Sequence, residues 1–320
     1  MAEKKIRLLA VVGSTASGKS ALAVALAKAL DGEIVSCDSM QIYRRMNIGT
    51  AKPSLEEQGG VVHHLIDFVD PECSFSCAEY VEHAKAAVAE IAGRGKLPIL
   101  CGGTGLYLDS LLRGGGFEET VTDPALREEL FAYAAQNGNE ALHERLAQVD
   151  PESAASIHPN NVKRVVRALE IYRTTGTTKT EADRRSVEGE SPYDATVIGL
   201  RYADRSILYE RIDRRVDAML AAGLLEETRR LQADGVFEKN ATAAQAIGYK
   251  ELLGYLRGEE SKESCVESLK RATRRYAKRQ ITWFGAKPYV RWIDLTDESG
   301  MRPFADVLAR ALAEFETEHL

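Results

Sequence analysis

A glycine- and hydroxyl-rich loop near the N-terminus constrains the fold of this chain more than any other feature. Residues 13–20 fit the pattern G-x-x-x-x-G-K-[ST]. Residues 6–12 before it are an apolar run, interrupted only by Arg7, that is typical of a buried parallel strand, and residues 20–30 after it have leucines at helical spacing. This order of strand, loop and helix predicts a cradle for a polyphosphate.

The residue types in the loop assign their own roles. The glycines let backbone N–H groups curl around phosphate oxygens, Lys19 neutralises those oxygens, and Ser20 is placed to ligate Mg²⁺. The motif does not distinguish one polyphosphate from another. We assign the diphosphate contacts to the whole loop: Gly13, Ser14, Thr15, Ala16, Ser17, Gly18, Lys19 and Ser20.

Strand and helix patterns alternate over much of the chain. Strands are indicated at 33–37, 97–101, 196–200 and 289–295, and helices at 76–92, 204–221 and about 261–284. Such alternation favours an α/β fold with a parallel sheet, here a P-loop NTPase-like core.

Residues 114–116, three glycines, interrupt this alternation, and only helical spacing follows until about 174. We therefore predict three segments: residues 1–114 as the first part of the core, 115–190 as an all-helical insertion domain that contacts a nucleic acid, and 191–320 as the rest of the core with a basic C-terminal helix.

The charge balance excludes a protein that holds nucleic acid through overall basicity. The 320 residues contain 42 Lys and Arg against 48 Asp and Glu, a net charge of −6. No run of about 18 apolar residues predicts a membrane span, and five scattered cysteines suit reduced thiols. We expect a cytoplasmic protein with no membrane partner.

Two polar residues follow predicted strands at the edge of the sheet where ligands bind. Asp38 follows the strand at 33–37, and Thr104 follows the strand at 97–101 in a second glycine-rich turn. Beside a diphosphate, a carboxylate suits a general base or a partner of the metal. The alternative for both residues is a helix or turn cap.

Local basic clusters favour an anionic partner although the chain is acidic. They are 163–167 in the insertion, 205–215, and 270–291 with interleaved aromatic residues. Each alone could be a solvated helix face, but several together suit contacts with phosphates.

Several motifs, in chain order, resemble those of the bacterial tRNA dimethylallyltransferase family. The resemblance covers about residues 8–292. Besides the phosphate loop, the motifs are residues 38–43, 48–53, 94–98, 102–107, 149–151, 157–160, 167–170, 247–249 and 273–280.

The resemblance implies prenylation of N6 of the adenine 3′ to the anticodon, with dimethylallyl diphosphate as donor and Mg²⁺ as cofactor. Asp38 matches the general base of that family. Arg215 matches an arginine that binds pyrophosphate, and Thr104 matches a threonine that holds the adenine. The substrates would enter opposite ends of one channel between core and insertion, with the adenine flipped from its stack.

The resemblance also implies that the partner is the anticodon stem-loop of tRNA, bound by a monomer. The matching tRNA contacts are Asp38, Ser39, Met40, Gln41, Thr104, Arg127, Lys163, Arg164, Val165, Val166, Arg167, Gln245, Ala246, Ile247, Gly248, Tyr249 and Lys250. This sequence departs from the family at Ser14, where proline is usual, and at Asn161 and Gly285.

Two other functions would use the same phosphate loop. One is a small-molecule kinase that uses ATP, and the other is a nucleic-acid-binding NTPase without modification chemistry. The basic clusters argue against the kinase because a metabolite is not a large polyanion. Asp38 at the strand end would have no purpose in the simple NTPase.

Overall fold

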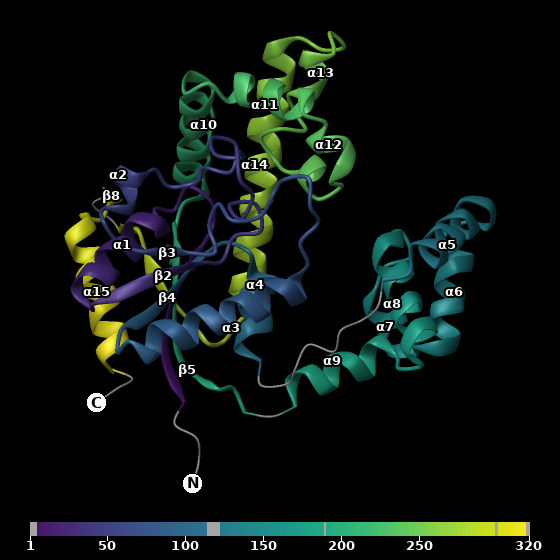
Figure 1. The fold of residues 1–320 in the computed structure, drawn as a ribbon, viewed down its shortest axis with the longest axis horizontal. Helices are drawn as coiled ribbons and strands as arrows, with labels where there is room; N and C mark the ends of the chain where they lie inside the picture. Colours follow the sequence, from purple (N-terminus) through teal and green to yellow (C-terminus); the bar gives the residue numbers. More distant parts are fainter. Residues whose placement is uncertain (1–4, 114–121, 189, 298–299, 318–320) are drawn as a thin grey trace. The chain divides into compact units, whose positions relative to one another are not determined.

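The computed structural model describes residues 5–113, 122–188, 190–297 and 300–317. The chain divides into two compact units, Arg113–Pro192 and the remainder (Figure 1). The glycine run 114–116 and the expected boundary between 114 and 115 lie outside the described residues. We call the larger unit the core unit and residues 113–192 the helical unit.

The core unit contains a six-stranded sheet in the order β3-β2-β4-β1-β5-β6, with every ladder parallel. This confirms the predicted α/β fold. The strands are β1 (Ile6–Gly13), β2 (Gly32–Ser36), β3 (His63–His64), β4 (Leu97–Gly102), β5 (Tyr193–Arg201) and β6 (Val290–Asp294). Sequence patterns missed β3 and the hairpin β7 (Thr296–Asp297) and β8 (Gly300–Met301), since two residues carry no period.

Helices cover the sheet in two apolar layers (Figure 1). One layer contains α1 (Lys19–Ala29) and α15 (Phe304–Thr317), and the other contains α3 (Cys77–Gly93) and α4 (Gly105–Leu112). Side chains of β1 alternate between the layers: Leu9 and Val11 pack in the first, Leu8 and Ala10 in the second. This double burial explains why β1 is apolar from Leu8 to Val12.

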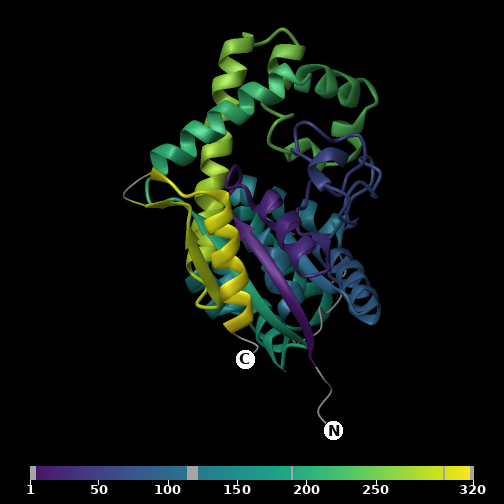
Figure 2. The ribbon, with the colours of Figure 1, turned by 90° about the vertical axis from the view of Figure 1, so that its left-hand side faces the viewer.

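A third apolar cluster lies beyond the sheet and is built around Tyr43, Tyr249 and Leu269. The long helices α10 (Arg205–Ala221) and α14 (Lys262–Gly285) lie side by side and extend into it (Figure 2). The shorter helical elements of the core unit are α2 (Leu55–Gln58), α11 (Leu224–Ala233), α12 (Val236–Lys239), η1 (Ala243–Gln245) and α13 (Leu253–Leu256).

In the helical unit, every regular element of the described residues is a helix: α5 (Pro124–Asn137), α6 (Asn139–Val149), α7 (Pro151–Ser156), α8 (Val162–Thr175) and α9 (Lys179–Val187). Asp123 and Asp150 cap α5 and α7, and each precedes a proline at the first helical position. Leu130, Leu142 and Val165 anchor the unit's own core. None of the helices described in either unit has the length and apolarity needed to span a bilayer.

Candidate active site

The phosphate loop has the backbone that its glycines predict. Gly13 has φ +148° and Gly18 has φ +86°, and a Cβ at Gly13 would lie 2.8 Å from the carbonyl oxygen of Leu200. Ala16 also takes a positive φ, +62°. Ser14 is buried, and its carbonyl accepts a hydrogen bond from Lys19 Nζ at 3.3 Å. The departure from proline therefore leaves a closed loop whose lysine folds back over it.

Two cations and a hydroxyl gather at the open side of the loop. Burial lowers the pKa of Lys19, and the charge of Arg215 lowers it further, whereas Cys101 and Asp38 act in the opposite direction. Burial also lowers the pKa of Arg215, with Asp38 opposing it. Ser20 is exposed at the start of α1. Both desolvated cations gain from a bound polyanion, so this side of the loop suits a diphosphate.

The donor set of this loop fits Mg²⁺ held by a single protein hydroxyl. The hydroxyl of Ser17 is buried and has no hydrogen-bond partner in the described structure, so the loop holds polar capacity that the protein itself does not use. The described residues contain no group of three metal-ligating side chains. Ser20 would therefore supply one ligand, and phosphate and water oxygens the others, as is usual for Mg²⁺.

Asp38 lies directly after β2 with one carboxylate oxygen engaged and one open. Oδ1 accepts hydrogen bonds from the N–H groups of Met40 at 2.9 Å and Gln41 at 3.3 Å. Asp38 therefore caps this turn, which is the alternative role that the sequence allowed. Oδ2 accepts no hydrogen bond from any described residue. Capping and proton acceptance are therefore compatible, because each uses a different oxygen.

Thr104 is joined to the Asp38 turn by hydrogen bonds. Its Oγ1 accepts from the N–H of Ser39 at 3.0 Å, and its own N–H donates to the carbonyl of Cys37 at 3.1 Å. The Thr104 hydroxyl donates to Ser39 Oγ at 3.4 Å, and Tyr276 of α14 lies near it. Burial raises the pKa of that tyrosine, and the charge of Asp38 raises it further. The adjacent ends of β2 and β4 thus bring both predicted residues together.

Gln280 connects the phosphate loop to the turn of Thr104, and sequence reasoning missed it. Its Oε1 accepts from the N–H of Thr15 at 2.8 Å, and its Nε2 donates to the carbonyl of Gly103 at 3.0 Å. A Cβ at Gly103 would lie 2.0 Å from that Nε2. The i, i+4 spacing of Tyr276 and Gln280 on α14 was the available signal.

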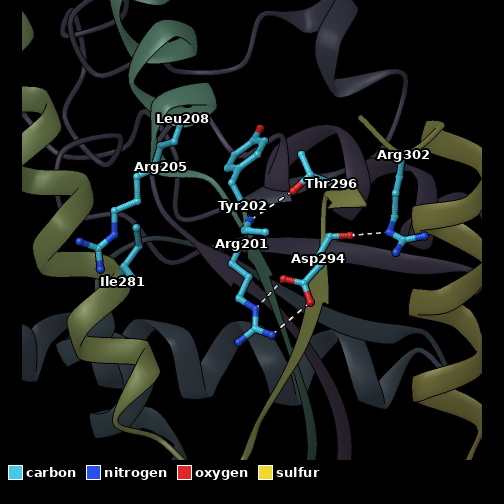
Figure 3. Close-up of a pocket in the computed structure, with 9 residues that line it drawn as sticks. Arg201, Tyr202, Arg205, Leu208, Ile281, Asp294, Thr296 and Arg302 are labelled. Atoms are coloured by element: carbon cyan, nitrogen blue, oxygen red, sulfur yellow. Dashed lines mark hydrogen bonds and ion pairs between the residues drawn. The ribbon is translucent and has the colours of Figure 1, made fainter. Parts of the chain in front are cut away.

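Ala16 of the loop is held from α10 and the end of β5. Its carbonyl accepts from Arg211 Nε at 3.1 Å and from the Tyr202 hydroxyl at 3.3 Å. Tyr202 also lines a cavity of about 520 Å³ where β5 and β6 end (Figure 3). Arg201 and Asp294 form a bidentate ion pair there, at 2.7 and 3.1 Å. Arg201 and Asp294 neutralise each other, so this pair leaves no free charge for a ligand in the cavity. We therefore keep the phosphate loop as the candidate active site.

The predicted cations of the helical unit fall into two groups. Glu170 is fully buried and accepts from Arg127 Nε at 2.8 Å and from Arg167 Nη1 at 2.5 Å. Burial alone would raise the pKa of Glu170, but these hydrogen bonds outweigh it and the pKa is lowered. Lys163 and Arg164 are exposed, and no acidic partner is seen for them in the described chain.

Two predicted contacts in the helical unit are core residues. The side chains of Val165 and Val166 are buried beside Leu169. They pack the helix that carries Lys163 and Arg164. Asn161 precedes this helix and is exposed without capping it through its side chain.

The remaining predicted contacts lie in the core unit. Gln41 Nε2 donates to the carbonyls of Thr50 and Ala51, at 3.2 and 3.1 Å. In the segment 245–250, Gln245 and Lys250 are exposed, Ile247 is half-buried, and the others are buried: Ala246, Gly248 and Tyr249. Ser39 and Met40 are half-buried.

Two cations of the basic helix α14 are paired with acids. Lys270 pairs with Asp217 at 2.6 Å, and Arg274 pairs with Asp213 at 2.7 Å. Both acids belong to α10. Gly285 ends α14 and has open space around it.

The fold and site define a class: a parallel α/β protein whose phosphate loop faces a carboxylate and a threonine at one sheet edge. The family model described as IPP transferase matches residues 41–287. The chain belongs to this family of tRNA dimethylallyltransferases, which confirms the resemblance.

Individual relatives and solved structures that are similar to the chain belong to the same family. The tRNA dimethylallyltransferases of Halalkalibacterium halodurans and Bacillus cytotoxicus are 48% and 49% identical to the chain, and each alignment covers 92% of both chains. The crystal structure of the full-length tRNA isopentenylpyrophosphate transferase from Bacillus halodurans matches with TM-score 0.72 and 44% identity, over 98% of both chains. A eukaryotic dimethylallyltransferase acting on tRNA matches with TM-score 0.78 and 31% identity, over 96% of this chain and 77% of that one.

Proposed function

We propose that the chain transfers a dimethylallyl group from dimethylallyl diphosphate to N6 of adenine 37 in tRNA and releases pyrophosphate. The observation that carries this proposal is the meeting of a polyphosphate loop with an open carboxylate oxygen at one sheet edge. A leaving group and a proton acceptor are the two parts that alkylation of an amine requires.

The loop and its cations hold the leaving group. As the bond between the allylic carbon and the diphosphate oxygen breaks, negative charge develops on pyrophosphate. Lys19, Arg215 and the loop N–H groups stabilise that charge where they are already desolvated. Mg²⁺ bound at Ser20 would neutralise part of the same charge.

Asp38 and Thr104 serve the acceptor. The adenine amine is a poor nucleophile because its lone pair is delocalised into the ring. Asp38 Oδ2 takes a proton from N6 as the bond from N6 to the allylic carbon forms. Thr104, fixed by Ser39, holds the base so that the amine and the leaving group are in line.

We assign the tRNA contacts by residue type and exposure. Lys163 and Arg164 suit phosphates of the anticodon stem-loop, and Gln245 and Lys250 offer polar groups from the core unit. An adenine stacked in the anticodon loop cannot reach the half-buried carboxylate of Asp38, so the proposal requires that adenine 37 is flipped out. We expect the protein to be cytoplasmic, since its acceptor is tRNA. We also expect it to be a monomer, and light scattering tests this oligomeric state.

Donor choice tests the proposal. The protein is incubated with Mg²⁺ and a tRNA bearing adenine 37, and with either labelled dimethylallyl diphosphate or labelled ATP. We expect label in RNA from the first donor only, and loss of transfer when EDTA removes the metal. Turnover of ATP without RNA labelling would replace the proposal with the kinase or the NTPase.

A further inference from the structure

A buried carboxylate in the core unit joins two segments that are far apart in the sequence. Glu227 of α11 is 8% exposed. Its oxygens accept hydrogen bonds from three successive N–H groups, those of Asn47 at 3.1 Å, Ile48 at 2.9 Å and Gly49 at 3.1 Å. Three donors converging on one carboxylate fix the backbone of residues 47–49.

The second segment reaches the same carboxylate through Tyr249. Its hydroxyl donates to Glu227 Oε1 at 2.7 Å, and its side chain is fully buried. A Cβ at Gly49 would lie 2.4 Å from the Tyr249 ring, and a Cβ at Gly248, which has φ +109°, would lie 3.1 Å from the Gly49 carbonyl oxygen. Residues 47–49 and 248–249 are therefore packed together over Glu227.

Both segments continue into residues that the proposed function assigns to RNA. Gln41, three residues after Asp38, donates to the carbonyls of Thr50 and Ala51, immediately after the segment that Glu227 holds. On the other side, the exposed Gln245 and Lys250 flank the segment that Tyr249 anchors. Hydrogen bonds and packing thus connect the Asp38 turn to residues 245–250 through Glu227.

We propose that Glu227 is a positioning residue for RNA binding, because its buried carboxylate locks residues 47–51 and 245–250 into one rigid surface. This rests on the proposed function, since RNA is the ligand of that surface. Glu227 itself is too buried to touch RNA. A carboxylate is needed because four donors meet there, and the NH₂ group of a glutamine would face donors with a donor.

The test compares Glu227→Gln with Glu226→Gln. Glu226 is the preceding residue of the same helix, is exposed, and makes only surface ion pairs with Arg229 and Arg230, so its replacement makes the same charge change without touching either segment. Binding of a labelled anticodon stem-loop is measured by fluorescence anisotropy without donor, and transfer kinetics are measured separately.

We expect Glu227→Gln to raise both the Kd and the KM for RNA by about tenfold or more, because charge-assisted hydrogen bonds are lost. The KM for dimethylallyl diphosphate and kcat should stay within about threefold, since Glu227 hydrogen-bonds neither Asp38, whose carboxylate is held by Met40 and Gln41, nor the phosphate loop. Glu226→Gln should match the wild type.

A role in folding alone would lower the active fraction equally toward both substrates, and unchanged RNA affinity in folded Glu227→Gln overturns the proposal. If Glu227→Gln does not fold, Tyr249→Phe is tested instead, because it removes one of the four donors. A smaller rise in the Kd and KM for RNA alone supports the proposal. An RNA affinity equal to that of the wild type overturns it. Anisotropy measures RNA binding without transfer. If Glu227→Gln binds RNA more weakly than the wild type, but the wild type prenylates no RNA, only the proposed function is contradicted.

Discussion

Gln280 holds Thr15 of the phosphate loop by a hydrogen bond of 2.8 Å, and with its other end it holds the carbonyl of Gly103. The leaving-group loop and the turn that carries Thr104 are therefore braced by one buried side chain. In-line displacement requires that donor and acceptor sites keep a fixed spacing, and this bridge supplies it.

Replacing Gln280 with leucine should leave two backbone polar groups without partners. We expect the free energy of unfolding to fall by about 2–4 kcal/mol, and kcat to fall at least tenfold at temperatures where the variant is folded. Urea unfolding and single-turnover transfer measure the two effects. Lys278→Ala, two residues away and exposed, is the control. A folded Gln280→Leu enzyme with wild-type kcat would show that the bridge has no part in alignment.

Asparagine at position 38 separates the two roles of Asp38. Its side-chain oxygen can still accept from Met40 and Gln41, so Asp38→Asn should keep the turn and bind tRNA normally. Because the amide takes no proton, the chemical rate should fall by about 10²–10⁴. Asp38→Ala should show the same loss together with weaker tRNA binding. A rate within a few-fold of wild type in Asp38→Asn would exclude Asp38 as the base.

Arg215 and its neighbour Arg214 form a matched pair. Arg215 is partly buried within electrostatic range of Lys19 and Asp38, whereas Arg214 is exposed and pairs with Glu210. We expect Arg215→Met to raise the KM for dimethylallyl diphosphate and lower kcat, each by about tenfold or more, because the arginine stabilises the departing pyrophosphate. Arg214→Met should change neither. Equal effects from both variants would point to a general loss of positive charge.

The sequence predicted the sheet and the phosphate loop because both are local patterns. Strand β1, the glycines at 13 and 18 and the leucines of α1 lie within 25 residues. Asp38 and Thr104 were predictable as strand-end residues. Glu227 was not, since its partners lie about 180 residues earlier in the chain. The pairing of Lys270 and Arg274 was not predictable for the same reason: the acids that neutralise them come from α10.

The salt dependence of tRNA binding should separate Lys163 and Arg164 from Arg167. Removing one cation that touches a phosphate lowers the slope of log K against log salt by about one. We expect that decrease for Lys163→Ala and for Arg164→Ala. The decrease should be smaller for Arg167→Ala because Arg167 already pairs with Glu170. Binding titrations between low and physiological salt measure the slopes. Unchanged slopes for Lys163→Ala and Arg164→Ala would show that these cations do not contact phosphates.

The buried Glu170 should make the helical unit sensitive to acid. Its pKa is lowered in the folded unit by Arg127 and Arg167, so its contribution to stability is complete above the unfolded value near 4.5 and is lost as pH falls through the folded pKa. The protection factors of the α5 and α8 amides, which divide out the pH dependence of the intrinsic exchange rate, should therefore fall in the wild type below about pH 4.5, toward those of Glu170→Gln. Glu129→Gln, which changes an exposed carboxylate on α5, should follow the wild type. If wild type and Glu170→Gln differ by the same amount at pH 3 and pH 7, the ion pairs of Glu170 do not hold the unit together.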